Sequence, residues 1–123
     1  MPRQTKNRRW NARVDIELPV AWQDERDGVV HVCTTTNLSA SGLAIRSPKG
    51  LPIGAGVYLV VGHPSLGLSF EAVADVVRSW PTASSEFLIG LNFRSLPLEL
   101  TAEIGRHVVS RLEQLERRRP SMP

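Results

Sequence analysis

Alternation of apolar and polar residues is the feature that most restricts how this 123-residue chain can fold. Every second position is apolar in the segment that carries Val14, Ile16, Leu18, Val20 and Trp22. Because successive side chains of a strand point to opposite faces, this pattern predicts a half-buried strand over residues 14–22. Pro19 within it indicates a sheet edge or a bend.

Further segments of strand character follow, and polar or Gly- and Pro-containing turns separate them. The polar segment 23–28 predicts a hairpin between the first strand and the second. The remaining strands are expected at about residues 29–36, 43–46, 57–61, 68–78 and 87–93. Six short strands of this kind favour a small antiparallel β-barrel.

The period then changes from two residues to three or four. Apolar residues recur at helical spacing at Leu100, Ile104, Val108, Leu112 and Leu115. They describe one face of a helix at about residues 97–117, which Ser95 or Thr101 could cap. The predicted fold class is therefore mainly β: a six-stranded antiparallel β-barrel with a C-terminal α-helix. Residues 1–11 are expected to form a flexible basic arm, and residues 12–119 a single domain.

Composition supports a globular protein, with 41% hydrophobic and 22% charged residues. No apolar run approaches the roughly 18 residues that a membrane span requires, and the first residues lack the apolar core of a secretory signal. One cysteine, Cys33, excludes an internal disulfide and suits a reducing compartment, so we expect a cytoplasmic protein. Because it lies in a predicted strand, Cys33 is expected to be a small buried apolar residue.

The beginning of the chain is basic. Five cations precede the first acid, Asp15, and they are Arg3, Lys6, Arg8, Arg9 and Arg13. Arg9 and Arg13 stand four residues apart. A second cluster, residues 117–119, suits a solvated helix end next to the negative pole of the helix dipole.

A polar corner is predicted between the second and third strands. Asn37 and Ser39 can hydrogen-bond to the local backbone or to a ligand. Gly42 can adopt positive φ or allow another group to approach the backbone closely. These three residues would present amide and hydroxyl groups along one rim of the sheet.

Together the two motifs resemble the paired signature of the PilZ family, whose members bind the bacterial second messenger cyclic di-GMP. The family signature is an R-x-x-x-R segment followed, across one hairpin, by D/N-x-S-x-x-G. Arg9 and Arg13 match the first part, and Asn37, Ser39 and Gly42 match the second. The resemblance covers about residues 8–116 and implies a six-stranded barrel with a C-terminal helix, as the strand count also predicts.

The resemblance assigns guanine and phosphate contacts to Arg9 and Arg13. A guanidinium fork matches the O6 and N7 acceptors of guanine, or a phosphate, better than an ammonium group does. The same resemblance assigns base and ribose contacts to the rim formed by Asn37, Ser39 and Gly42.

Two further arginines enter through the resemblance. Arg8 directly precedes the R-x-x-x-R segment, where the family residue influences whether one nucleotide or an intercalated pair binds, and an arginine indicates the pair. Arg78, at the end of the fifth strand, corresponds to a position that often faces the ligand. Its alternative role is an ion pair with Glu71 or Asp75. Trp10 and Trp80 could stack on a base or cover the core.

We expect a stand-alone cytoplasmic receptor for cyclic di-GMP, whose arm becomes ordered on binding and signals to an unidentified protein partner or through a homodimer. The alternatives are a PilZ-like scaffold that binds only protein, and a basic nucleic-acid-binding module, which the small number of aromatic residues disfavours. No cofactor is expected. The three histidines lack metal-ligand spacing, and no P-loop, G-x-S-x-G or H-E-x-x-H motif occurs, so neither a metal site nor an enzyme is predicted.

Overall fold

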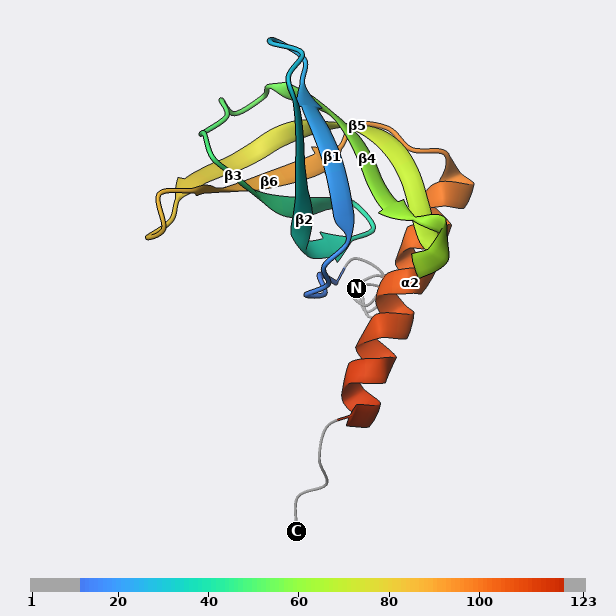
Figure 1. The fold of residues 1–123 in the computed structure, drawn as a ribbon. Helices are drawn as coiled ribbons and strands as arrows, with labels where there is room; N and C mark the ends of the chain where they lie inside the picture. Colours follow the sequence, from blue (N-terminus) through green and yellow to red (C-terminus); the bar gives the residue numbers. More distant parts are fainter. Residues whose placement is uncertain (1–11, 119–123) are drawn as a thin grey trace, which may run out of the picture.

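The computed structural model describes residues 12–118, and they form a closed barrel with one long helix (Figure 1). Its elements are β1 (Pro19–Asp24), β2 (Val30–Ser39), β3 (Gly42–Ser47), β4 (Gly56–His63), a 3₁₀ turn (Pro64–Leu66), β5 (Leu68–Pro81), β6 (Phe87–Phe93) and α2 (Leu98–Arg118). Around the barrel the strands are ordered β1-β2-β3-β6-β5-β4, and all neighbours are antiparallel. The predicted fold class, a six-stranded antiparallel barrel with a C-terminal helix, is confirmed.

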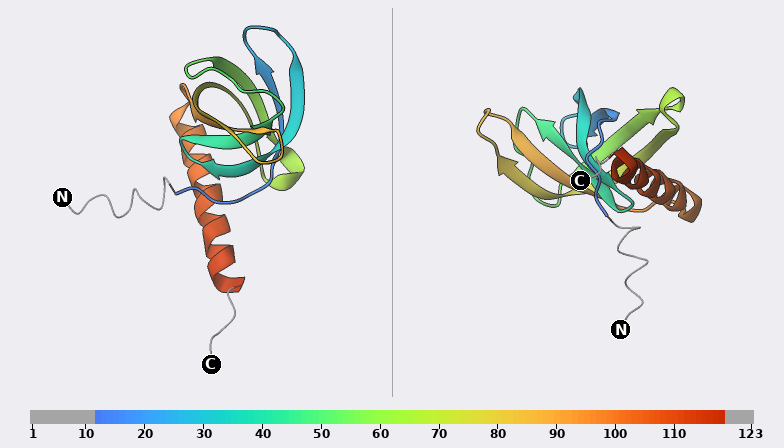
Figure 2. Two further views of the ribbon diagram at one scale, coloured as in Figure 1. Left: turned by 90° about the vertical axis from the view of Figure 1, so that its left-hand side faces the viewer. Right: turned by 90° about the horizontal axis from the view of Figure 1, so that it is seen from below.

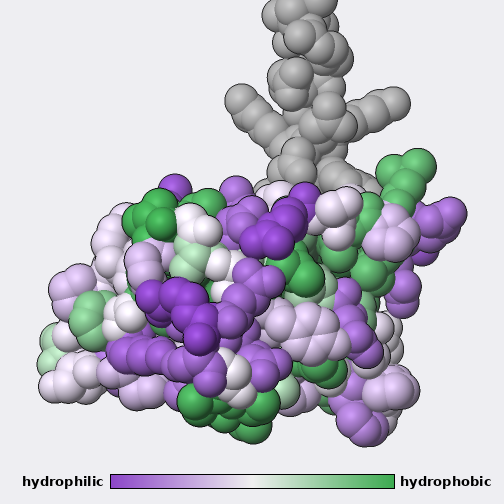
Figure 3. All heavy atoms as spheres, turned by 90° about the horizontal axis from the view of Figure 1, so that it is seen from above, coloured by the Kyte–Doolittle hydropathy of each residue, from purple (hydrophilic) through white to green (hydrophobic). Residues whose placement is uncertain are grey.

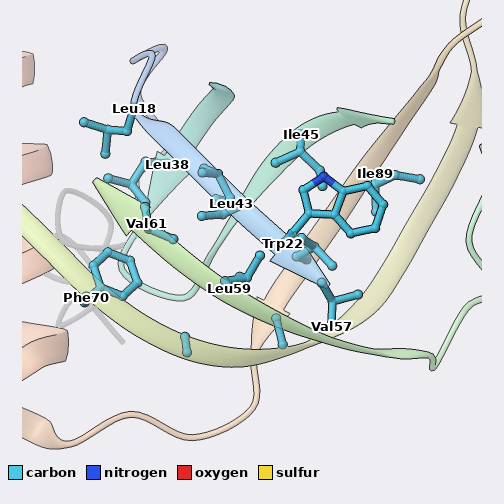
Figure 4. Packing of buried hydrophobic residues seen from close by; sticks show 14 of the residues in the cluster. Leu18, Trp22, Leu38, Leu43, Ile45, Val57, Leu59, Val61, Phe70 and Ile89 are labelled. Carbon is cyan, nitrogen blue, oxygen red and sulfur yellow. The ribbon is translucent and has the colours of Figure 1, made fainter. Parts of the chain in front are cut away.

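Side chains that point inward from all six strands fill the barrel (Figure 4). Trp22, Leu43, Leu59 and Ile89 are each at most 1% exposed. Helix α2 adds Ile104 and Val108 to this core, as its three- and four-residue spacing predicts. The helix lies across one end of the barrel, and its C-terminal half extends beyond the sheet (Figure 2). Hydrophilic side chains gather over the other end, which carries the β1–β2 turn (Figure 3).

The first predicted strand is shorter than its alternation suggested. The regular ladder of β1 begins only at Pro19, whereas Val14 makes an isolated bridge to Leu38. Between these points the Thr35 side chain replaces backbone partners, because its Oγ1 accepts from Leu18 N and donates to Ile16 O. Val14 and Leu18 remain buried, so the alternation predicted burial correctly but not the ladder.

Two register shifts decide which side chains reach the outside of the barrel. One lies in β2 between Thr35 and Asn37, and the other in β5 between Val76 and Arg78. An extra residue in one strand reverses the facing of those that follow it. Within residues 12–118, no helix is long and apolar enough to cross a membrane.

Candidate functional site

One row of residues crosses four neighbouring strands and brings two of the predicted site residues together. Asn37 of β2 pairs with Ala44 of β3, Ala44 pairs with Gly90 of β6, and Gly90 pairs with Arg78 of β5. The centre of the row therefore carries almost no side chain, and a polar group stands at either end. We call the hollow above this row the row hollow.

Arg13 lies at the β2 end of the row hollow. Its Nη1 donates a hydrogen bond to Asn37 Oδ1 at 3.2 Å, and both side chains keep contact with solvent. This contact joins the second arginine of the R-x-x-x-R segment to the first residue of the N-x-S-x-x-G motif, across 24 residues of sequence. The amide holds the guanidinium at the surface without neutralising it.

Arg78 lies at the β5 end and packs against an aromatic ring. Its guanidinium carbon is 5.4 Å from the centroid of the Trp80 ring, a cation–π geometry, and Trp80 is 54% exposed. Neither acid proposed as its alternative partner is paired with it: Glu71 accepts from the Tyr58 hydroxyl, and Asp75 accepts from Arg94 at 2.7 Å. Arg78 thus keeps an exposed charge that no described carboxylate pairs with, and Trp80 does not cover the core.

The floor of the row hollow was not predicted from the sequence. The row hollow has a volume of about 100 Å³, and the residues that line it are Arg13, Asn37, Ala44, Val77, Arg78, Trp80, Leu88 and Gly90. A Cβ at Gly90 would lie 3.3 Å from Cβ of Arg78, so glycine leaves room for that arginine. A glycine inside a strand signals the close approach of another group, and Gly90 stands in β6 at a position between the alternating apolar residues Ile89 and Leu91.

The predicted corner at residues 37–42 is mostly strand. Strand β2 continues through Ser39 and β3 begins at Gly42, so only Ala40 and Ser41 form the turn. The sequence reading was wrong here because Asn and Ser, although they favour turns, also pair within a ladder when their side chains find partners.

Ser39 uses its hydroxyl inside the turn. Its side chain is buried, and Oγ lies 3.2 Å from both Ser41 Oγ and Gly42 O. The backbone N–H of Ser41 also donates to it, at 3.3 Å. In this structure the hydroxyl therefore stabilises the turn next to the row hollow and does not project from a rim.

Gly42 is required by packing and not by positive φ, which the structure places at other glycines. A Cβ at this position would collide with the carbonyl oxygen of Leu91 on β6. The strands β3 and β6 can approach each other at this point only because no side chain intervenes. Gly42 thus allows the close approach of β3 to β6, the two strands that carry the centre of the row.

Arg8, Arg9 and Trp10 lie outside the described residues. Cys33 is half-buried, not fully buried as expected, and its burial raises the pKa of the thiol. Within residues 12–118, no group of His, Cys, Asp or Glu side chains is arranged to hold a metal ion.

Two guanidiniums, one amide and one indole ring around a floor of small residues suit a flat, anionic ligand. The guanidiniums can pair with phosphate oxygens or with a guanine edge, and a base can lie against the ring or against a guanidinium plane. The shallow floor lets such a ligand approach the sheet backbone.

Comparison with known proteins identifies a family. The model of the PilZ domain matches residues 7–110. No curated protein sequence matches the chain.

Solved structures of low sequence identity share the fold. The inhibitor of motility MotI/DgrA from Bacillus subtilis is 23% identical, with a TM-score of 0.71 over 89% of this chain and 52% of its own. The complex of K. pneumonia MrkH with c-di-GMP is 14% identical, with a TM-score of 0.71 over 89% of this chain and 54% of its own. The PilZ domain of YcgR with c-di-GMP from Escherichia coli is 15% identical, with a TM-score of 0.62 over 87% of this chain and 92% of its own. The chain spans about half the length of the MotI and MrkH chains.

Proposed function

Because the chain belongs to the PilZ domain family, we propose that it is a receptor for cyclic di-GMP. Two of the structural neighbours, MrkH and the YcgR domain, are complexes with that nucleotide. The observation that carries the proposal for this chain is the row hollow. There the Arg13–Asn37 hydrogen bond and the Arg78–Trp80 stack stand at opposite ends of a floor formed by Ala44 and Gly90.

Each part of the row hollow offers a contact for a part of the ligand. Cyclic di-GMP has two phosphates and two guanines. Arg13 and Arg78 supply forked donors for a phosphate or for guanine O6 and N7, and Asn37 supplies an amide that both donates and accepts. Trp80 and the plane of the Arg78 guanidinium supply stacking surfaces.

Residues 1–11 complete the proposed site. Arg9 would act with Arg13 on the same ligand, and Arg8 favours binding of an intercalated nucleotide pair. The arm would become ordered across the outer face of the barrel as its arginines engage, which is an order–disorder switch. The new surface made by the arm and the nucleotide would then be read by a protein partner or by a second copy of the chain.

Isothermal titration calorimetry with cyclic di-GMP tests this function on the wild type and on the Arg9→Ala, Arg13→Ala double variant. The variant should bind at least about 100-fold more weakly, because charge-assisted hydrogen bonds contribute roughly 1.5–3 kcal/mol each. The matched control is Arg106→Ala with Arg117→Ala, which removes the same charge from exposed positions on α2. A stoichiometry of two nucleotides per chain would support the role of Arg8.

Amide NMR signals of the arm test the switch separately. They should sharpen into dispersed, protected signals as the nucleotide saturates the chain. If calorimetry shows binding while the arm signals stay unchanged at saturation, the receptor function stands and the switch is refuted. If the wild type binds no cyclic di-GMP, the proposed function is wrong.

A further inference from the structure

Among residues 12–118, strand β2 has no partner along one edge of its first half. Residues 30–34 pair with β1 on one side, but the pairing of β2 with β3 begins only at Thr35. The exposed side chains of Val30 and Val32, 60% and 80% exposed, lie on this half-strand. An unpaired edge offers backbone donors and acceptors to any extended segment that lies beside it.

A groove follows this half-strand along the outside of the barrel. Its volume is about 930 Å³, and its floor is formed by residues 32–36. Asp15 and Glu17 line one wall, and Arg46 and Glu86 line the other. Three carboxylates and one guanidinium therefore line the groove, in a chain whose formal net charge is +3. We call this feature the acidic groove.

We propose that the acidic groove binds residues 1–11 of the same chain when no nucleotide is present. This segment lies outside the described residues, and its sequence contains Arg3, Lys6, Arg8 and Arg9 without an acid. Its charge complements that of the walls, and an extended backbone complements the free edge of β2.

The point at which residues 1–11 join the described domain favours this segment over a separate molecule as the occupant. Arg13 is held at Asn37, next to Thr36 at one end of the groove floor. Eleven extended residues reach roughly 36 Å, whereas the five floor residues extend over about 17 Å, so the segment can turn back and still span the groove. A tether this short gives an effective concentration of about millimolar, above that of most soluble partners.

This inference rests on the proposed function at one point, since it names a competitor for the arm. Arg8 and Arg9 cannot face the acidic groove and a nucleotide in the row hollow at once. Binding of the nucleotide would then withdraw the arm and expose the edge of β2. In the nucleotide-free state, the arm would thus have a defined position in the acidic groove.

NMR of the full chain without nucleotide tests the docking itself. In a variant with Arg3, Lys6, Arg8 and Arg9 all changed to Gln, the amide signals of residues 32–36 should shift, because their neighbour has gone. Raising NaCl to about 0.5 M should move the wild-type signals the same way, since screening weakens exposed charge pairs. Identical groove signals in wild type and variant would overturn the proposal. A shift that depends on protein concentration would overturn it too, because a second copy would then fill the groove.

Neutralising the walls tests the competition. The Glu17→Gln, Glu86→Gln variant should bind cyclic di-GMP about threefold more tightly, the gain expected when two exposed ion pairs no longer hold the arm. The charge-matched control is Glu99→Gln with Glu103→Gln, which are exposed on α2 and should leave the affinity within error of the wild type.

The two experiments separate the two proposals. If the wild type binds no nucleotide but its groove signals depend on the arm, docking stands and the receptor function fails. If the nucleotide binds while the wall variant and the α2 control have equal affinities, the competition fails and the receptor function stands.

Discussion

Strand β2 begins beside one charged cluster and ends beside another. At its start, strand β2 lies next to Asp24, the last residue of β1, whose side chain is 1% exposed and accepts hydrogen bonds from the Arg26 backbone N, Nε and Nη2. The Lys49 Nζ lies 3.8 Å from Asp24 Oδ2 and 2.6 Å from Asp27 Oδ2. These contacts hold the pKa of Asp24 at about 2, below its usual 3.8, with the Arg26 side chain as the main cause.

At its end, the row hollow holds arginines whose contacts are neutral. Arg13 donates to the Asn37 amide, and Arg78 lies over the Trp80 ring. A cation that an amide or a ring holds in place keeps most of its capacity to pair with an anion, whereas a cation bonded to a carboxylate has already used it. Similar residues therefore stabilise the fold at one end of β2 and remain available for a ligand at the other.

A substitution at Gly42 tests whether the end of β2 that carries the row hollow also contains a residue with a purely structural role. The Gly42→Ala variant should lose about 3 kcal/mol of unfolding free energy, because its Cβ would meet the Leu91 carbonyl and force β3 away from β6. Urea denaturation followed by circular dichroism measures the loss. Gly50→Ala is the control, since its Cβ would meet only the Phe87 ring, 3.1 Å away, which can move. If Gly42→Ala keeps wild-type stability but loses the nucleotide, the glycine acts on the ligand and the packing argument is wrong.

A substitution at Asp24 tests the stabilising role of the ion pairs beside the start of β2. The Asp24→Asn variant should lose about 2 kcal/mol of unfolding free energy, the value of a pKa held from 3.8 to about 2. Its affinity for cyclic di-GMP should stay within twofold of the wild type, because Asp24 lies next to the start of β2, at the opposite end from the row hollow. Loss of affinity without loss of stability would reverse the roles assigned to the two ends.

The pH dependence of stability follows from the same pKa. Because the carboxylate is favoured in the folded state, its contribution is complete above about pH 5 and is lost as the pH falls through 3.8 toward 2. The difference in unfolding free energy between wild type and Asp24→Asn should therefore shrink over that range. Urea unfolding at pH 6, 4 and 3 measures it, and a constant difference would contradict the assigned cause.

Much of the fold could be predicted because burial follows local alternation. The strands, the closed barrel and the face of α2 that carries Ile104 and Val108 all come from periods of two and of three to four residues. The start of the β1 ladder at Pro19 could not be placed, because the backbone groups before it bond to the Thr35 hydroxyl, which lies 17 residues from Leu18. Backbone partners at such separations leave no local pattern.

The candidate site could be predicted only in part, for the same reason. The motifs named Arg13 and Asn37, and the family resemblance added Arg78. The structure brings Asn37 and Arg78 into one row and Arg13 to the Asn37 end of it. The row itself depends on two register shifts, in β2 and in β5, that no local pattern announces. Ala44 and Gly90 were therefore missed as its floor, and Ser39 was expected at a rim although its hydroxyl is buried in the turn.

Substitution of Arg78 should give the smallest of these effects, and it is the most direct test of the row hollow as a ligand site. The Arg78→Ala variant should weaken cyclic di-GMP binding about tenfold, the loss of one charge-assisted contact of roughly 1.4 kcal/mol. Its unfolding free energy should change by less than about 0.5 kcal/mol, because the side chain is exposed and stacks only on an exposed ring. Calorimetry and urea denaturation measure the two quantities on the same preparations.

Two further variants separate geometry from charge at Arg78. Arg78→Lys keeps the charge but loses the planar fork, so it should recover only part of the affinity if the fork pairs with guanine or a phosphate. Arg106→Ala on α2 removes an equal charge from an exposed position and should leave the affinity unchanged. Full recovery by lysine would mean that Arg78 contributes only long-range attraction. Equal weakening by Arg106→Ala would mean that the ligand does not bind specifically at the row hollow, because a cation elsewhere on the surface would then contribute as much as the one beside Gly90.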